Sequence, residues 1–141
     1  MSCLVFHHVG LLTGQPEVAC ARLQMLGYDC GEPVYDPLQD VVLCMCDGPA
    51  GAPRMELVTP RPSNLSLSRL LRRKDDYGYH VCYSSPSISE GLAALGDDTL
   101  GRIVEVMAPK PAILFGGARV AFFSVPGLGL VELLEQGSAA P

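Results

Sequence analysis

The stretch VFHHVGLL, residues 5–12, places two adjacent histidines, His7 and His8, inside a run of apolar residues near the N-terminus. Its length and composition predict a β-strand, in which neighbouring side chains point to opposite faces of the sheet. One of the two imidazoles is therefore expected to face inward. The rest of the chain indicates whether that imidazole serves packing or belongs to a site.

The composition is that of a globular protein with a real hydrophobic core, since 48% of the 141 residues are hydrophobic. A net charge of −5 argues against nucleic acid or an anionic membrane as the main partner. No run approaches the roughly 20 apolar residues of a membrane span, and the N-terminus lacks the pattern of a signal peptide. We therefore expect a cytoplasmic protein that binds small molecules, with neither nucleic acid nor a membrane as a partner.

The expected elements follow the order βαβββ twice. The first half contains a helix and four extended segments, expected at 13–27 and at 4–12, 30–35, 40–46 and 54–59. The second half contains a strand, a helix, a strand and a hairpin, expected at 77–84, 85–96, 102–107 and 118–135. The apolar faces of the two helices are expected to consist of Ala19, Leu23 and Leu26, and of Ile88, Leu92 and Leu95.

Short matches between the halves indicate an internal repeat. The pairs HV and LG occur in both halves, and MELV at 55–58 corresponds to VELL at 131–134. The sequence therefore predicts one α+β domain over 1–136, with two βαβββ modules, a curved mixed sheet and a flexible tail. The predicted boundaries are module one at 4–60, a connector at 61–76, module two at 77–136 and the tail at 137–141.

The repeat places a histidine in the first strand and a glutamate in the last strand of each module: His8 with Glu56, and His80 with Glu132. Taken singly, a strand glutamate usually faces solvent and a histidine is usually a packed residue. Their recurrence at equivalent points predicts instead one site for a divalent ion of Zn, Ni, Co, Mn or Fe, with positions left open for substrate. Glu135 is expected to face solvent on the opposite side of its strand from Glu132.

The six cysteines are mostly in apolar segments at irregular spacings, which favours packing over disulfides. Cys44 and Cys46 share one strand face and could form a soft-metal pair, but their spacing is shorter than that of known zinc motifs. The packing interpretation is preferred. The basic segment SRLLRRKDD, residues 68–76, is interpreted as a solvated helix face that could also meet a phosphate group or an acidic carrier protein.

Four motifs in order, HHVG, RMELVTP, GYHVCY and GLGLVELLE, resemble the ligand strands of the vicinal oxygen chelate superfamily, which includes glyoxalases, methylmalonyl-CoA epimerases, extradiol dioxygenases and fosfomycin resistance enzymes. The resemblance extends over nearly the whole chain and implies the metal ligands His8, Glu56, His80 and Glu132. A glutamate at position 56 is similar to bacterial glyoxalase I, because epimerases commonly have glutamine there. The stretches GYHVCYSSPSISEGLAAL and PKPAILFGGARVAFF look more like epimerases.

The resemblance implies a metal-dependent isomerase or lyase that removes a proton next to a carbonyl group, with Glu132 or Glu56 as the candidate catalytic base. The first expectation is an epimerase-like enzyme acting on an acyl thioester, and a homodimer. The alternatives are a glyoxalase I-type enzyme acting on a glutathione hemithioacetal, and a metal-free drug-binding protein of the same fold. The additional catalytic glutamate of the epimerases would lie near Leu38, with Asp36, Gln39 and Asp40 around it.

Overall fold

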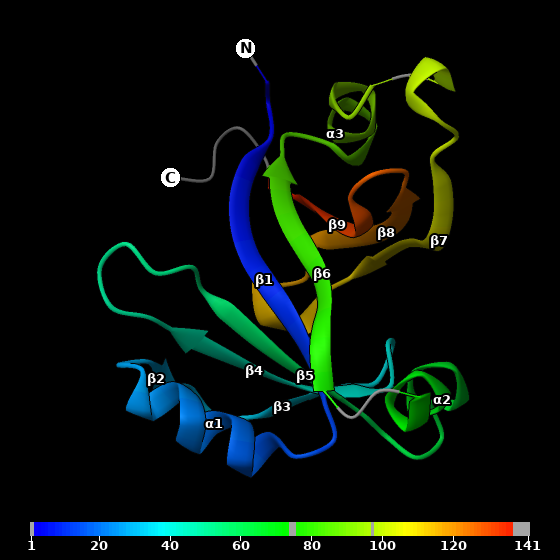
Figure 1. Ribbon diagram of the computed structural model, residues 1–141. Coiled ribbons are helices and arrows are strands. Elements are labelled where there is room, and N and C mark those ends of the chain that lie inside the picture. The colour runs from blue at the N-terminus through cyan, green and yellow to red at the C-terminus, as the bar shows by residue number, and fades with distance from the viewer. Residues whose placement is uncertain (1, 74–75, 97, 137–141) are drawn as a thin grey trace. The chain divides into compact units, whose positions relative to one another are not determined.

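The computed structural model describes residues 2–73, 76–96 and 98–136, and it has the mixed sheet and few helices of an α+β protein, as predicted (Figure 1). The predicted tail at 137–141 lies outside the described residues. Two compact units can be distinguished, residues 8–79 (the first unit) and residues 1–7 with 80–141 (the second unit). Among the described residues, no helix is both long enough and apolar enough to cross a membrane.

The first unit contains most of β1 and the elements up to α2. The bounds are β1 Val5–Thr13, α1 Pro16–Met25, β2 Asp29–Cys30, β3 Val34–Asp36, β4 Val41–Asp47, β5 Met55–Pro60 and α2 Leu65–Arg73. Strand β1 pairs in parallel with β5, β5 pairs antiparallel with β4, and β2 and β3 both pair with β4. The extended segment expected at 30–35 is therefore interrupted, and its two parts are separate short strands.

Helix α1 covers one face of these strands. Leu23 packs with Leu57 and two cysteines of β4, and Ala19 lies beside this cluster. The prediction that Leu26 completes the apolar face is wrong, because the helix ends at Met25 and the Leu26 side chain is 68% exposed. Gly27 follows with a φ of 91°, a left-handed conformation that suits glycine after a helix.

Helix α2 provides the one short helix predicted in the connector. Asn64 caps it, because its side-chain oxygen accepts a hydrogen bond from the Leu67 amide at 3.2 Å. The amide group of the same Asn64 side chain donates to the Gln39 carbonyl oxygen at 3.0 Å. The start of α2 is therefore fastened to the turn between β3 and β4.

The second unit repeats this connectivity. Its elements are β6 Asp76–Ser85, which begins in the first unit, α3 Ile88–Ala94, β7 Val104–Pro111, β8 Arg119–Val125 and β9 Gly129–Glu135, with single 3₁₀ turns at Asp98–Leu100 and Ile113–Phe115. Strand β6 pairs in parallel with β9, β9 pairs antiparallel with β8, and β8 with β7. The predicted hairpin is formed by β8 and β9 and turns between Val125 and Gly129, with Gly127 at a φ of 86°.

The core of the second unit lies beneath α3. Ile88 packs against Phe123 and Leu133, and the other two predicted face residues, Leu92 and Leu95, lie against the same cluster. The helical spacing of these three residues therefore predicted the buried face correctly.

Candidate functional site

His8 and Glu56 form a buried pair in the first unit. His8 is 0% exposed and Glu56 is 3% exposed, and the Nε2 atom of His8 lies 3.5 Å from Oε1 of Glu56. Both residues belong to the parallel strands β1 and β5, whose alternation directs these two side chains to the same face. Burying a carboxylate costs free energy unless a polar or charged group accompanies it, and His8 supplies that group for Glu56.

His80 and Glu132 form the corresponding pair in the second unit. Nε2 of His80 lies 3.1 Å from Oε1 of Glu132, and both side chains are almost fully buried. The ring of Phe122 meets the imidazole of His80 edge to face, with the ring centres 5.1 Å apart. Sequence analysis did not identify Phe122. Side chains alternate along β8, so Phe122 lies on the face of the sheet opposite to that of the core residue Phe123.

The two pairs occupy the same position in the strand register. The residue paired with Glu56 is Gly10, two residues after His8, and the residue paired with Glu132 is Cys82, two residues after His80. Each predicted histidine therefore meets the glutamate of its own module, at the same step of the parallel ladder.

His7 points away from the face that His8 occupies, as the strand periodicity requires. It is partly exposed, and its ring lies edge to face against Phe115 with a centroid distance of 5.1 Å. The expectation that one of the two adjacent imidazoles faces inward is confirmed, and the buried one is His8.

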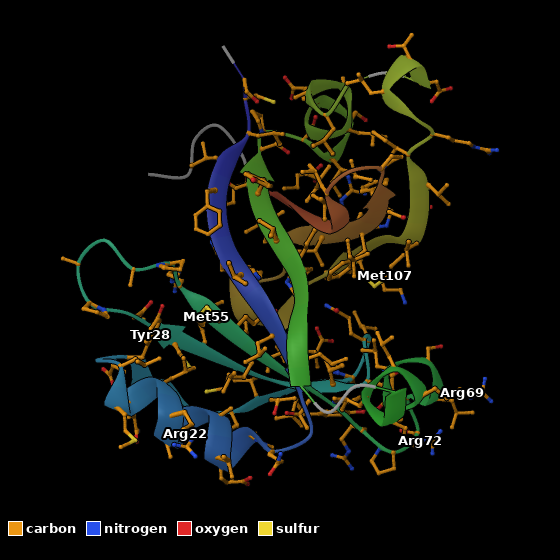
Figure 2. All side chains as sticks on the ribbon, in the orientation of Figure 1. Arg22, Tyr28, Met55, Arg69, Arg72 and Met107 are labelled. Atoms are coloured by element: carbon orange, nitrogen blue, oxygen red, sulfur yellow. The ribbon has the colours of Figure 1, made fainter. Side chains whose placement is uncertain are left out.

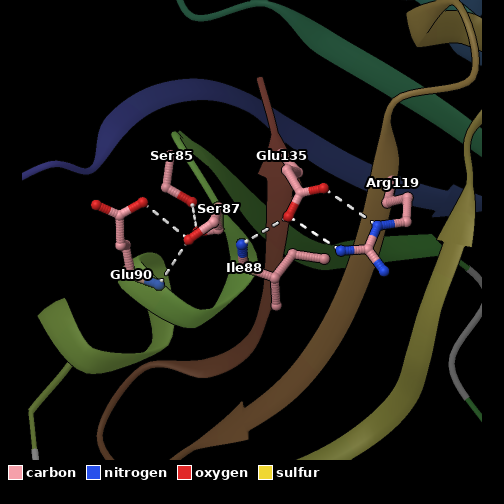
Figure 3. A network of polar contacts seen from close by, with 6 residues as sticks. All are labelled: Ser85, Ser87, Ile88, Glu90, Arg119 and Glu135. Atoms are coloured by element: carbon pink, nitrogen blue, oxygen red, sulfur yellow. Dashed lines mark hydrogen bonds and ion pairs between the residues drawn. The ribbon is translucent and has the colours of Figure 1, made fainter. Parts of the chain in front are cut away.

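Glu135 lies on the face of β9 opposite to Glu132, as expected, and its side chain is 25% exposed, but it also has a structural role. Its carboxylate accepts hydrogen bonds from Nε and an NH2 group of Arg119 at 3.1 and 3.2 Å, and from the Ile88 amide at 3.1 Å (Figure 3). The hydrogen bond from Arg119, followed by that from the Ile88 amide, holds the pKa of Glu135 below its ordinary value of 4.5. Figure 3 also shows Ser87 capping α3 through the Glu90 amide.

The acidic residues near position 38 also build structure. Asp36 is 1% exposed, and one of its oxygens accepts hydrogen bonds from the amides of Leu38 and Gln39 at 2.9 and 3.3 Å. Its other oxygen accepts from the Gln39 side chain at 3.2 Å. Asp40 has a φ of 56° and accepts from the Tyr35 hydroxyl, which raises the pKa of Tyr35. These carboxylates form the turn between β3 and β4, and the Leu38 side chain is 53% exposed.

Residues 68–73 of the basic segment belong to α2, and Lys74 and Asp75 lie outside the described residues. Figure 2 shows the side chains of Arg69 and Arg72 extending outward from this helix, and both residues are exposed. This arrangement agrees with a solvated helix face.

Four of the six cysteines gather in the first unit, which sequence analysis did not anticipate. Cys44 and Cys46 share a face of β4, as predicted, but Cys20 from α1 and Cys30 from β2 join them. The members of this group come from three different elements, so their spacing along the chain is irregular and does not indicate the group.

The comparisons with known proteins agree with the fold. The family model described as the Glyoxalase/Bleomycin resistance protein/Dioxygenase superfamily matches residues 7–122. No curated protein shows a significant sequence match to the chain.

Several solved structures share the fold at low sequence identity. The methylmalonyl-CoA epimerase from Mycobacterium tuberculosis has a TM-score of 0.76 and 19% identity, over 100% of this chain and 92% of the other. A hypothetical protein from Bacillus halodurans C-125 has a TM-score of 0.74 and 20% identity, with 98% of each chain covered. A variant of the Streptomyces coelicolor methylmalonyl-CoA epimerase, in complex with 2-nitronate-propionyl-CoA, has a TM-score of 0.75 and 16% identity, over 99% of this chain and 100% of the other.

The repeated βαβββ connectivity, the matching His–Glu pairs and the family model over residues 7–122 all agree. The chain belongs to the glyoxalase/bleomycin resistance protein/dioxygenase superfamily, the vicinal oxygen chelate superfamily that its strand motifs resemble.

Proposed function

We propose that the protein is a metal-dependent isomerase that removes a proton from the carbon next to the carbonyl group of an acyl thioester. The observation that supports this most strongly is the buried His–Glu pair that recurs at the same register in both units. Most members of the superfamily are enzymes, which agrees with a catalytic role.

We propose that His8, Glu56, His80 and Glu132 together hold one divalent ion of Zn, Ni, Co, Mn or Fe. The donor set fits such an ion, because imidazole nitrogen and carboxylate oxygen are common ligands of first-row metals. Each pair alone offers two donor residues, fewer than the three or four protein ligands of typical catalytic zinc sites. Bound there, the ion would supply a Lewis acid for a carbonyl oxygen.

Glu132 is the first candidate for the catalytic base, and Glu56 is the second. A carboxylate beside a buried histidine can accept a proton from one face of the substrate carbon, and inversion then requires that a second group return a proton to the other face. Phe122, stacked edge to face on His80, would restrict the orientation of this imidazole. The apolar surroundings of both pairs would exclude water from the reacting carbon.

An acyl-CoA thioester is the proposed substrate class. Solved structures of the same fold include a methylmalonyl-CoA epimerase in complex with methylmalonyl-CoA. The exposed Arg69 and Arg72 of α2 offer positive charge for the phosphate groups of such a substrate. A glyoxalase I-type reaction on a glutathione hemithioacetal is the second candidate, because Glu56 supplies a carboxylate where epimerases commonly have glutamine.

Deuterium exchange tests the proposed reaction. The metal-loaded protein would be incubated in D₂O with 2-methylmalonyl-CoA, with other 2-substituted acyl-CoAs and with the methylglyoxal–glutathione adduct, and deuterium uptake followed by mass spectrometry. Exchange in the acyl-CoA set without conversion of the adduct is the expected result. Conversion of the adduct alone would favour the glyoxalase reaction.

A metal-stripped sample is the matched control for the exchange experiment. Exchange should disappear on removal of the ion and return when the ion is restored. If no compound in the set reacts in the presence of metal while a small hydrophobic drug binds tightly, the protein is a binding protein of the same fold and the proposed reaction is refuted.

A further inference from the structure

The four grouped cysteines of the first unit form a compact sulfur cluster. The Sγ atoms of Cys20, Cys44 and Cys46 all lie within 4.8 Å of one another. The Sγ of Cys46 lies 3.1 Å from that of Cys30 and 4.0 Å from that of Cys44. Four thiols from a helix and two strands therefore converge on a small volume, which packing of the apolar face does not require.

The local structure explains this convergence. Cys44 and Cys46 are two residues apart in β4 and point to the same face. Cys30 is the register partner of Cys46 across the antiparallel β2–β4 pair, so its side chain lies next to that of Cys46. Cys20 reaches the group from α1, which covers this face of the sheet.

Two of the sulfur–sulfur distances lie within an ångström of the spacing in a tetrahedral zinc site, and Cys30 stands outside the trio in which every Sγ separation is at most 4.8 Å. With Zn–S bonds of about 2.3 Å, tetrahedral geometry sets neighbouring sulfur atoms about 3.8 Å apart. The Cys44–Cys46 distance of 4.0 Å already matches this spacing, and the Cys30–Cys46 distance would have to open by less than an ångström. Cys20 and Cys30 are only partly buried, which leaves their side chains room to adjust.

A cation can reach the sulfur atoms. A cavity of about 590 Å³ lies between α1 and the strands, and Cys20, Cys30 and Cys44 are among its lining residues. Cys46 lies beneath them and is 0% exposed.

The environment does not favour a reactive thiol. Burial, followed by the hydrogen bond with Cys30, raises the pKa of Cys20 to about 12 and also raises the pKa of Cys46. The thiolate is the nucleophilic form of cysteine, so neutral thiols of this kind are poor nucleophiles. Metal ligation, in contrast, stabilises the thiolate directly.

We propose that Cys20, Cys30, Cys44 and Cys46 form a structural site for Zn²⁺ that joins α1 to β2 and β4, separate from the two His–Glu pairs. On binding, four Zn–S bonds form and the four thiol protons pass to solvent, with no change in oxidation state. A closed site of four thiolates leaves no position for substrate, so the ion stabilises the first unit and takes no part in the reaction.

Cobalt substitution tests the site. The reduced, metal-free protein would be titrated with Co²⁺ without oxygen, and sulfur-to-cobalt charge-transfer absorption would be recorded in the near ultraviolet. We expect this absorption to saturate and to disappear on addition of excess Zn²⁺. Ligation by imidazole and carboxylate alone does not produce this absorption, so its appearance does not depend on the His–Glu pairs.

Variants identify the ligands. Cys44→Ser and Cys46→Ser should abolish the absorption, while Cys3→Ser and Cys82→Ser should retain it, since neither residue belongs to the cluster. Cys82→Ser is the essential control because Cys82 follows His80 by two residues in β6. If the buried Cys46→Ser variant does not fold, the partly exposed Cys20→Ser provides the same test and should weaken cobalt binding at least tenfold.

Thermal unfolding provides a second readout. Excess Zn²⁺ should raise the melting temperature of the Cys82→Ser protein by more than that of the Cys20→Ser, Cys44→Ser double variant, because only the His–Glu residues can bind the ion in the double variant. Absence of charge-transfer absorption in the reduced wild-type protein, or its persistence in this double variant, would overturn the proposal.

Discussion

Arg119 holds Glu135 through two hydrogen bonds across the β8–β9 pair, and the same carboxylate receives the Ile88 amide at the start of α3. One side chain therefore joins two strands and a helix. Glu132, three residues earlier in β9, is instead paired with His80 on the opposite face. Two glutamates of one strand thus have separate roles.

The Glu135 contacts predict a pH dependence of stability. The pKa of Glu135 is lowered in the folded protein, chiefly by Arg119, so its contribution is complete above the ordinary pKa of 4.5 and is lost as the pH falls below that value. Glu135→Gln should destabilise the protein at pH 7 by about 0.5–1 kcal/mol, and this cost should shrink as the pH falls below 4.5. Urea unfolding of both proteins across this pH range measures the difference, and a cost that does not change with pH would contradict the assignment.

Glu132 and Glu135 should differ in catalysis. Glu132→Gln removes a candidate base and should lower the rate of deuterium exchange by about 100-fold or more. Glu135→Gln should retain most of the wild-type rate once the folded fraction is taken into account, because its carboxylate is bound to Arg119 and Ile88. Equal losses in the two variants would refute this separation of roles.

The proposed His–Glu metal site predicts matched effects from the two units. Mn²⁺ suits this test because it prefers oxygen and nitrogen ligands to thiolates. His8→Ala and His80→Ala should each weaken Mn²⁺ binding by roughly 10-fold to 100-fold or more. Loss of a residue that only supports a metal ligand already costs that much, and loss of a ligand should cost at least as much. Titration of the free-ion electron paramagnetic resonance signal measures the affinity. Cys20→Ser serves as the control and should bind Mn²⁺ like the wild type, whereas normal binding by either histidine variant would exclude a site shared by both pairs.

Gly91 should be intolerant of a side chain. A Cβ atom at this position of α3 would lie 2.6 Å from Oγ of Ser85 and 3.2 Å from Cδ1 of Leu133. Gly91→Ala should therefore cost roughly 1–3 kcal/mol through overpacking, despite the better helix propensity of alanine. Thermal unfolding should show a melting temperature lower by about 3–10 °C. Ser89→Ala, at an exposed position of the same helix, should leave it nearly unchanged.

Asp36 should matter for stability and not for chemistry. Asp36→Ala would leave the Leu38 and Gln39 amides without their acceptor and should cost about 1–3 kcal/mol. Chemical denaturation measures this cost, with the exposed Glu32→Ala as the acidic control. If the folded Asp36→Ala protein instead lost its exchange activity with unchanged stability, Asp36 would be a catalytic acid or base.

The repeat and the alternation of side chains explain why so much of the fold was predictable. His8, Glu56, His80 and Glu132 stand at equivalent points of two similar sequences, and the strand period of two fixes the face of each side chain. The helix faces followed from spacing in the same way, except at Leu26, where α1 had already ended.

Contacts between residues distant in sequence could not be predicted. Cys20 and Cys30 join Cys46 only because α1 folds back onto the strands, and no motif marks that contact. Strand alternation gave the face on which Glu135 lies, but it could not give the partner of its carboxylate. Arg119 became that partner only through the antiparallel pairing of β8 with β9.

Because the two His–Glu pairs share one strand register, the kinetics of variants at Glu56 and Glu132 can be compared directly. The repeat makes Glu56 and Glu132 related by symmetry, yet their strand neighbours differ: Gly10 and Met45 beside Glu56, Cys82 and Phe122 beside Glu132. The same substitution can therefore be compared at two equivalent positions. Kinetic effects that Glu56→Gln and Glu132→Gln share reflect the duplicated scaffold, and effects that differ reflect the different strand neighbours and the substrate.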